Sequence, residues 1–299
     1  MKTEDYLQKV LERESLSEKS AEIKALQDEK KEVDKLLKDG FKESNPKIRY
    51  AGSYKKDTMI RDSFDLDISC YFKHEEDEAG ETLEEIYNNV RKTLETKYIV
   101  TPKTSALRLE NKNADKYGVY FHIDVVPGRF VDDKEQDTYL YQKDGDKDRL
   151  QTNLDKHIDH IKNSGLTDVI KLVKYWRTRK GLQIRTFVLE LLVVEVLRKN
   201  PPDTLEGRLK KFWKTLTEEI EEIKIEDPAN PTGNDLSRFF DTIVKSTLSS
   251  HASIEISNIG NGNWENIFGK IEEMSEAQKV SSIKTFSASI PQAAKPWSF

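Results

Sequence analysis

Three aspartates set inside apolar, alternating runs constrain this chain more than any other feature of its sequence. Asp65 and Asp67 lie in the run 64–72, and Asp124 lies in the run 121–127. Such runs are typical of β-strands, in which side chains two residues apart point to the same face. Asp65 and Asp67 are therefore expected to project side by side. The sequence predicts two neighbouring strands that bring all three carboxylates together.

Three carboxylates at one point repel one another and need a positive partner. Ligation by oxygen alone suits Mg²⁺ or Mn²⁺. Two such ions stabilise both the attacking and the leaving oxygen of a phosphoryl transfer. A lone Asp-x-Asp pair in a chain with 54 acidic residues would be an ordinary solvated loop. The apolar flanks argue against that reading, so the pattern predicts a metal site for Asp65, Asp67 and Asp124.

Gly52 and Ser53 stand where a strand is expected to end and a helix to begin, 13 residues before Asp65. A glycine lets the backbone approach a phosphate closely, and the start of a helix offers unpaired N–H donors. By itself the Gly-Ser pair would be an ordinary helix cap. Together with the aspartates it predicts a turn that binds a triphosphate.

The composition limits the classes of protein to consider. The chain has 299 residues, enough for two packed lobes, and 34% of them are charged. Its net charge of −5 does not favour nucleic acid as a partner. The single cysteine, Cys70, excludes an intramolecular disulfide and a cysteine-based zinc site. No membrane-spanning run or signal segment is found, so a cytoplasmic location without membrane contact is expected.

Periodicity divides the chain into two parts. A long helix over 17–39 and a mixed sheet with packed helices are expected first, followed by an all-helical part. The fold class is therefore α+β, with domains 1–150 and 151–299, and the polar segment 132–148 is expected to be the connector between them or a mobile loop. The expected strands lie near 48–50, 64–72, 104–110 and 117–127. The other expected helices are 54–62, 82–97, 152–163, 167–180, 185–199, 204–223 and 234–248.

The order Gly-Ser, Asp-x-Asp and a third Asp resembles the polymerase-β-type nucleotidyltransferase superfamily. In the second part, residues 172–176 and 187–192 resemble the helices that hold the donor nucleotide in 2′-5′-oligoadenylate synthases. Residues 225–234 resemble the Asp-Pro-x-x-Pro-Thr-Gly-Asn segment of that family's C-terminal domain. Bacterial relatives with this layout are the cGAS/DncV-like nucleotidyltransferases, which make cyclic oligonucleotide signals in anti-phage defence. The resemblance covers residues 45–270, and it implies a polymerase-β-like lobe followed by a helical lobe.

The resemblance also implies roles for the first-lobe residues already singled out. Asp65, Asp67 and Asp124 would bind two Mg²⁺ ions, with Mn²⁺ as a substitute. Asp124 would in addition be a candidate general base toward the attacking ribose hydroxyl. Gly52 and Ser53 would hold the β and γ phosphates.

Four residues of the helical part complete the implied nucleotide site. Lys174 would contact the triphosphate with Lys171 nearby, and Phe187 would stack on the donor base beside Thr186. The family often has Tyr at the stacking position and Ser or Gln before it, so base selectivity does not follow from these residues. Without the resemblance, both lysines would be assigned to a solvated helix face and Phe187 to the core.

Two histidines of the helical part, His157 and His160, lie near acidic residues in the sequence and are expected to be exposed helix residues rather than metal ligands.

The implied function is synthesis of cyclic di- or trinucleotides from nucleoside triphosphates, with release of pyrophosphate. Control by a partner is expected, through a regulatory protein or a phage-derived activator. The alternatives are an RNA-directed transferase of the CCA-adding or oligoadenylate-synthase type, and an inactive nucleotide-binding module. A CCA-adding enzyme needs a basic RNA-binding part, which the acidic net charge does not support.

Overall fold

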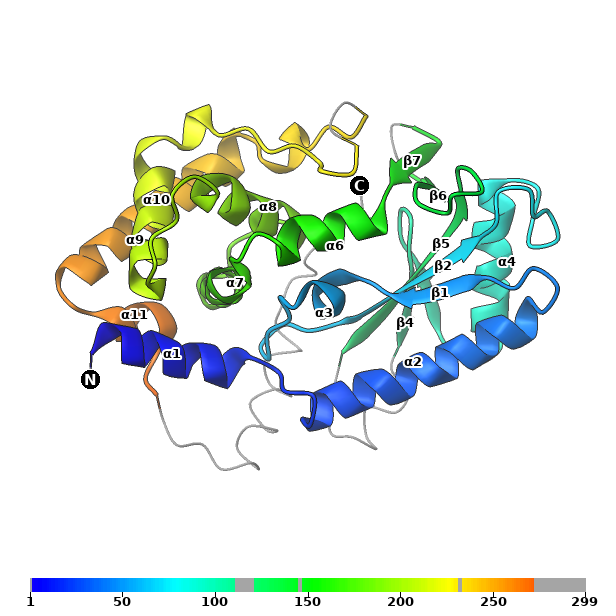
Figure 1. The fold of residues 1–299 in the computed structure, drawn as a ribbon, viewed down its shortest axis with the longest axis horizontal. Helices are drawn as coiled ribbons and strands as arrows, with labels where there is room; N and C mark the ends of the chain where they lie inside the picture. Colours follow the sequence, from blue (N-terminus) through cyan, green and yellow to red (C-terminus); the bar gives the residue numbers. More distant parts are fainter. Residues whose placement is uncertain (1, 111–120, 145–146, 231–232, 272–299) are drawn as a thin grey trace.

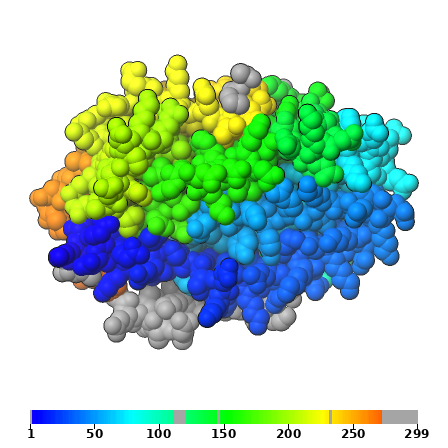
Figure 2. All heavy atoms as spheres, viewed as in Figure 1, coloured from blue at the N-terminus to red at the C-terminus, as the bar shows by residue number. Residues whose placement is uncertain are grey.

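The structure is a computed structural model that describes residues 2–110, 121–144, 147–230 and 233–271. The strands gather in one half of the molecule and most helices in the other (Figure 1). The space-filling view shows the two N-terminal helices, α1 and α2, along one edge of both halves (Figure 2). The α+β fold class predicted from the sequence is confirmed.

Within the described residues the strands form one seven-stranded sheet with the order β1-β2-β5-β4-β3, to which β6 and β7 are added at β5. The pair β2–β5 is parallel and the remaining pairs are antiparallel. Every residue of β2 is buried, as expected of a central strand covered on both faces. The strands are β1 (Lys47–Tyr50), β2 (Leu66–Phe72), β3 (Val100–Pro102), β4 (Leu107–Glu110), β5 (His122–Phe130), β6 (Thr138–Tyr141) and β7 (Arg149–Thr152).

Two helices cover one face of this sheet, α2 (Ala21–Gly40) and α4 (Leu83–Glu95). Their apolar residues recur at helical spacing and pack on the apolar side chains of β2, β4 and β5. The predicted helix 17–39 begins later than expected, because Ser20 caps it by accepting a hydrogen bond from the Ile23 N–H.

The other half is built on a core of large aromatic side chains, including Trp176, Phe212, Trp213 and Phe268. Its longer helices are α6 (Leu154–Lys162), α7 (Thr167–Lys180), α8 (Thr186–Leu197), α9 (Leu205–Glu218) and α10 (Thr242–Gly260). The short ones are η1 (Ile220–Glu222), η2 (Ser237–Phe239) and α11 (Trp264–Phe268). The predicted helices 152–163, 167–180 and 185–199 are confirmed as α6, α7 and α8.

The N-terminal helix α1 (Thr3–Glu14) was not predicted. It packs on α7 and α9, and its apolar residues join the core of the helical half. The division into domains 1–150 and 151–299 stays a prediction. Helix α1 shares its hydrophobic core with the second of these parts, although its residues belong to the first.

Other predictions differ from the structure in their bounds. The segment 132–148, predicted as a connector, contains β6, which extends the sheet. The predicted helix 234–248 is replaced by η2 and by α10, which starts at Thr242 after the Asp241 cap. The predicted helix 54–62 is the shorter α3 (Gly52–Lys56). The first part of the predicted strand 117–127 lies outside the described residues, and the rest is β5. Among the described helices, none combines the length and apolar content needed to cross a bilayer.

Candidate active site

The register of the two parallel strands brings the predicted acids together. Asp67 on β2 is the direct partner of Asp124 on β5, so both side chains leave the same face of the sheet. Both are buried, with 4% and 2% of their surface exposed. Asp65 lies just before β2 and accepts a hydrogen bond from the His122 backbone N–H at 3.4 Å. The register thus places Asp67 beside Asp124, and Asp65 contacts the first residue of β5.

A cation that the sequence interpretation missed is held on the third acid. Arg108 on β4 donates two hydrogen bonds to Asp124, from Nε to Oδ1 and from Nη2 to Oδ2, both at 2.8 Å. Burial lowers the pKa of Arg108, but Asp124 and the charges of Asp65 and Asp67 raise the pKa overall. The sequence feature that could have indicated Arg108 is a basic residue between Leu107 and Leu109 in a predicted strand.

The donor atoms at this site are suited to a hard divalent cation, because all of them are carboxylate oxygens. In the described part of the chain, no three acidic, histidine or cysteine side chains are already spaced to hold a metal ion. Both oxygens of Asp124 accept hydrogen bonds from a positive group instead. The Arg108 guanidinium thus takes the place of a metal cation at Asp124. The negative charges of Asp65 and Asp67 also stabilise this positive group.

The Gly-Ser turn lies directly against these acids. The Ala51 N–H donates to the backbone oxygen of Asp67 at 2.9 Å, which fixes the turn to β2. Gly52 has φ +60°, and a Cβ placed there would lie 1.7 Å from Oδ2 of Asp67. Only glycine fits this close approach, and the structure thus joins the predicted turn to the predicted acids.

Gly52→Ala is expected to reduce both stability and activity. The left-handed backbone alone costs an L-residue about 1–2 kcal/mol, and the methyl group would also displace the Asp67 carboxylate. Thermal unfolding and nucleotide turnover measure the two losses. Gly262→Ala is the matched control, because Gly262 has φ +71° with open space around it. Equal losses in the two variants would show that contact with Asp67 is unimportant.

Three cations lie on α7 at intervals of three residues, and the two lysines among them contact the sheet half. Lys171 pairs with Asp57 at 3.0 Å, and Lys174 donates to the Thr58 backbone oxygen at 2.6 Å. Arg177 donates to Thr186 Oγ1 at 2.7 Å. All three are buried, so these two lysines do not lie on a solvated face.

Comparisons with known proteins agree with this geometry. No protein-family profile matches the chain. The CBASS oligonucleotide cyclase CdnC of Escherichia coli (strain KTE188) is 26% identical over 212 residues, which span 66% of this chain and 66% of that protein. CdnC of E. coli MS115-1, solved with HORMA-deltaN, has a TM-score of 0.70 at 17% identity and covers 89% of this chain and 96% of its own. The Vibrio cholerae DncV cyclic AMP-GMP synthase, solved with nonhydrolyzable GTP, has a TM-score of 0.59 at 18% identity and covers 90% and 86%. In sequence the chain is similar to a CBASS oligonucleotide cyclase, and in fold it is similar to the solved structures of CdnC and DncV.

A buried acid, Glu190 on α8, joins the two halves. Its carboxylate pairs with the Lys56 ammonium and accepts from Thr58 Oγ1 at 2.6 Å, and Lys174 lies 3.5 Å away. Burial raises the pKa of Glu190, but the two lysines outweigh burial and hold it below its usual value. Burial lowers the pKa of Lys174 to about 8, although Glu190 opposes that shift. The sequence feature that could have indicated this cluster is an acidic residue inside an otherwise apolar stretch of helix. A buried carboxylate in such a place needs buried partners.

Phe187 and Thr186 stand at the start of α8 beside this cluster. The Phe187 ring is 2% exposed and packs on the His157 ring, with centroids 4.7 Å apart. The Lys56 ammonium lies 5.7 Å from the Phe187 ring centroid. The side chain thus borders the site from within the core, and stacking on a donor base stays a prediction.

The Asp-Pro segment is tied to α6 through a buried histidine. His157 was expected to be exposed, but it is buried and its Nε2 lies 3.2 Å from Asp227 Oδ1. Asp227 also accepts from the Asn234 side chain at 2.7 Å and from the Ala229 N–H at 2.8 Å. His160 is exposed, as expected. Positions 231 and 232 of the segment lie outside the described residues.

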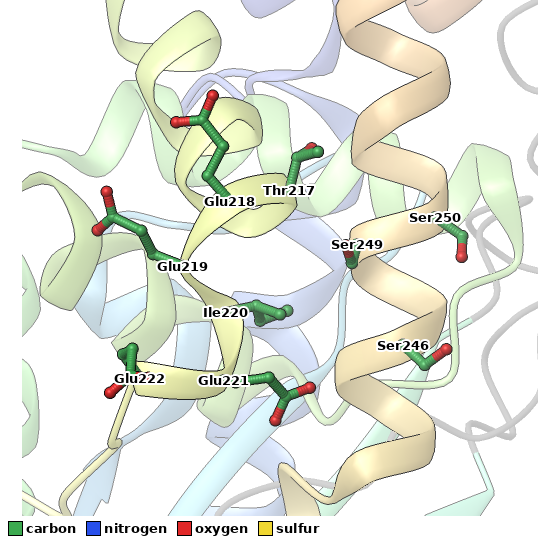
Figure 3. Close-up of a pocket in the computed structure, with 9 residues that line it drawn as sticks. All are labelled: Thr217, Glu218, Glu219, Ile220, Glu221, Glu222, Ser246, Ser249 and Ser250. Carbon is green, nitrogen blue, oxygen red and sulfur yellow. The ribbon is translucent and has the colours of Figure 1, made fainter.

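A surface hollow of about 340 Å³ lies elsewhere, between the end of α9, η1 and α10 (Figure 3). Its lining includes Glu218, Glu219, Glu221 and Glu222, and the carboxylates of Glu219 and Glu222 point away from α10 (Figure 3). The four glutamates at this hollow disfavour the binding of a triphosphate there.

Proposed function

We propose that this chain joins nucleoside triphosphates into cyclic di- or trinucleotides, with release of pyrophosphate, as a signal in anti-phage defence. The observation that carries the proposal is the direct pairing of Asp67 with Asp124 beside the Gly52 turn. Two buried lysines of the helical half contact Asp57 and Thr58, which follow this turn in the chain. The relatives' printed names, an oligonucleotide cyclase and a cyclic AMP-GMP synthase, support the same chemistry.

In the proposed reaction a ribose hydroxyl oxygen attacks the α-phosphorus of the donor nucleotide. A new P–O bond forms, the bond to the β-phosphate oxygen breaks, and pyrophosphate leaves. Asp124 accepts the proton of the hydroxyl. Closure of the ring repeats this step between the hydroxyl at one end of the linear product and the triphosphate at the other, with release of a further pyrophosphate; a trinucleotide needs one more addition before closure.

The other residues mainly position the donor, because phosphoryl transfer depends on placement and charge neutralisation. Gly52 and Ser53 receive the β and γ phosphates, and Lys171 and Lys174 contribute positive charge from α7. Thr186 and Phe187 lie at the donor base, which a ring can hold without reading its identity. Asp65, Asp67 and Asp124 would hold two Mg²⁺ ions, which when bound neutralise the triphosphate and stabilise the entering and leaving oxygens.

The expected products identify the reaction class. The purified protein is incubated with Mg²⁺ and all pairs of the four triphosphates, with and without RNA, then treated with phosphatase and analysed by mass. Phosphatase-resistant di- or trinucleotides without RNA are expected. Lengthened RNA would instead indicate an RNA-directed transferase, and nucleotide binding without any product would indicate an inactive module.

We also propose that a partner controls this activity. One relative, the E. coli CdnC, was solved in a complex with HORMA-deltaN, which supports a regulatory protein as the partner. A site formed where two halves meet is sensitive to small displacements, since a misplacement of about 1 Å can cost on the order of 10² in rate. Product formation that is no faster in extract from phage-challenged cells than with the purified protein alone would reject this control.

A further inference from the structure

Arg108, Asp124 and Asp67 form a row across three neighbouring strands. Arg108 on β4 is the register partner of Asp124 on β5, and Asp124 is the register partner of Asp67 on β2. Side chains at paired positions leave the same face of a sheet. The guanidinium and both carboxylates therefore share one buried surface, where Arg108 is 9% exposed.

The contact between Arg108 and Asp124 is the strong kind of ion pair. Two parallel N–H donors meet the two oxygens of one carboxylate at 2.8 Å, and burial removes the competition from water. Breaking such a pair without a replacement leaves a buried charge uncompensated. A cation that ligates Asp124 would provide that replacement.

A divalent ion and the Arg108 guanidinium compete for this carboxylate. Both need its oxygens, and a divalent ion placed beside the guanidinium is repelled by it. A neighbouring cation is under the same influences: burial lowers the pKa of Lys103 and the charge of Arg108 lowers it further, whereas Asp124 raises it. Arg108 therefore reduces the attraction of Asp124 for a further positive charge as long as the guanidinium stays in place.

We propose that Arg108 is a resident cation that occupies the third carboxylate before substrate arrives and thereby weakens divalent-metal binding. Metal binding requires the guanidinium to leave Asp124. The inference rests on the proposed nucleotidyltransferase site and adds to it the residue that sets its metal affinity. It predicts that metal binds weakly to the chain alone.

The test measures Mn²⁺ binding to the full chain without nucleotide, by electron paramagnetic resonance of the free ion. Arg108→Gln removes the charge while retaining an amide donor, and it is expected to lower the Kd for Mn²⁺ at least about tenfold. Arg91→Gln is the control, because Arg91 pairs with Glu95 on the exposed side of α4. That variant is expected to bind Mn²⁺ as the unchanged protein does. An unchanged or higher Kd in Arg108→Gln would overturn the proposal.

A second variant tests the proposal in case Arg108→Gln folds poorly. Arg108→Lys keeps the charge but cannot donate to both oxygens in parallel, so its Kd is expected to fall between the other two. Mn²⁺ should also raise the thermal midpoint of Arg108→Gln more than that of the unchanged protein. An equal or smaller rise, or an Arg108→Lys protein with an unchanged or higher Kd, counts against the proposal.

The outcome is separable from the proposed function. An unchanged protein that makes cyclic product while its Arg108 variants bind Mn²⁺ no more tightly would reject only the role of Arg108. A protein that neither binds Mn²⁺ nor forms product would reject the nucleotidyltransferase site and this inference with it.

Discussion

Asp65→Ala combined with Asp67→Ala is expected to reduce product formation by about 10³-fold or more while the protein stays folded. The reason is that phosphoryl transfer depends on neutralising the triphosphate, and the two carboxylates are the proposed metal ligands at the start of β2. The fold should survive because removing two like charges relieves repulsion around Asp124. Pyrophosphate release measures the first effect, and thermal unfolding measures the second.

A matched control removes two carboxylates elsewhere. Asp132 and Asp133 are exposed in the turn between β5 and β6, and Asp132→Ala with Asp133→Ala makes the same change in net charge. This variant is expected to keep full activity. Substantial turnover in the Asp65 and Asp67 variant would contradict the proposed mechanism, because neither of these two metal ligands would then be required.

The strands that carry the acids could be predicted because their pattern is local. An acidic residue inside a run of buried apolar residues is costly without a purpose, and the alternation shows which side chains share a face. This reasoning placed Asp67 and Asp124 on strands that the structure pairs directly. It could not place Arg108 on Asp124, because that contact depends on the register of β4 against β5.

Elements stabilised by distant contacts were missed. Helix α1 has apolar residues at helical spacing, but it packs against the other end of the chain, and the Tyr6 hydroxyl donates to the Gly269 backbone oxygen. Strand β6 lies in a charge-dense segment whose period-2 pattern is short, with Thr138 and Leu140 inward. In both cases the partner surface, rather than the local sequence, makes the element stable.

The burial of the α7 lysines was missed for an electrostatic reason. Lysines on an amphipathic helix usually face water, since burying an ammonium is costly. Here Asp57 pairs with Lys171 and Glu190 pairs with Lys174, so the cost is offset within the interface. The local sequence shows the cations but not the acids that they meet.

Glu190→Ala is expected to destabilise the protein by about 3–5 kcal/mol, because it leaves the ammonium groups of Lys56 and Lys174 buried without their counter-ion. Both lysines are about 95% buried or more, and Thr58 loses the acceptor of its hydroxyl. Urea unfolding measures the loss. Glu195→Ala, on the same helix, is the control, since the Glu195–Arg198 pair lies near the surface and is expected to contribute at most about 1 kcal/mol.

Removing the whole charged cluster separates its contribution to stability from its contribution to function. Glu190→Leu with Lys56→Met and Lys174→Met replaces every buried charge by an apolar side chain of similar size, and such replacements are often neutral or stabilising. This triple variant is expected to regain most of the stability lost in Glu190→Ala. Its KM for triphosphate is expected to be higher than that of the unchanged protein, because the charge of Lys174 is missing. If Glu190→Ala unfolds no more easily than Glu195→Ala, the two halves are not held together by this cluster. If the triple variant instead regains a normal KM, Lys174 has no part in binding the triphosphate, because the fold is restored without any charge at position 174.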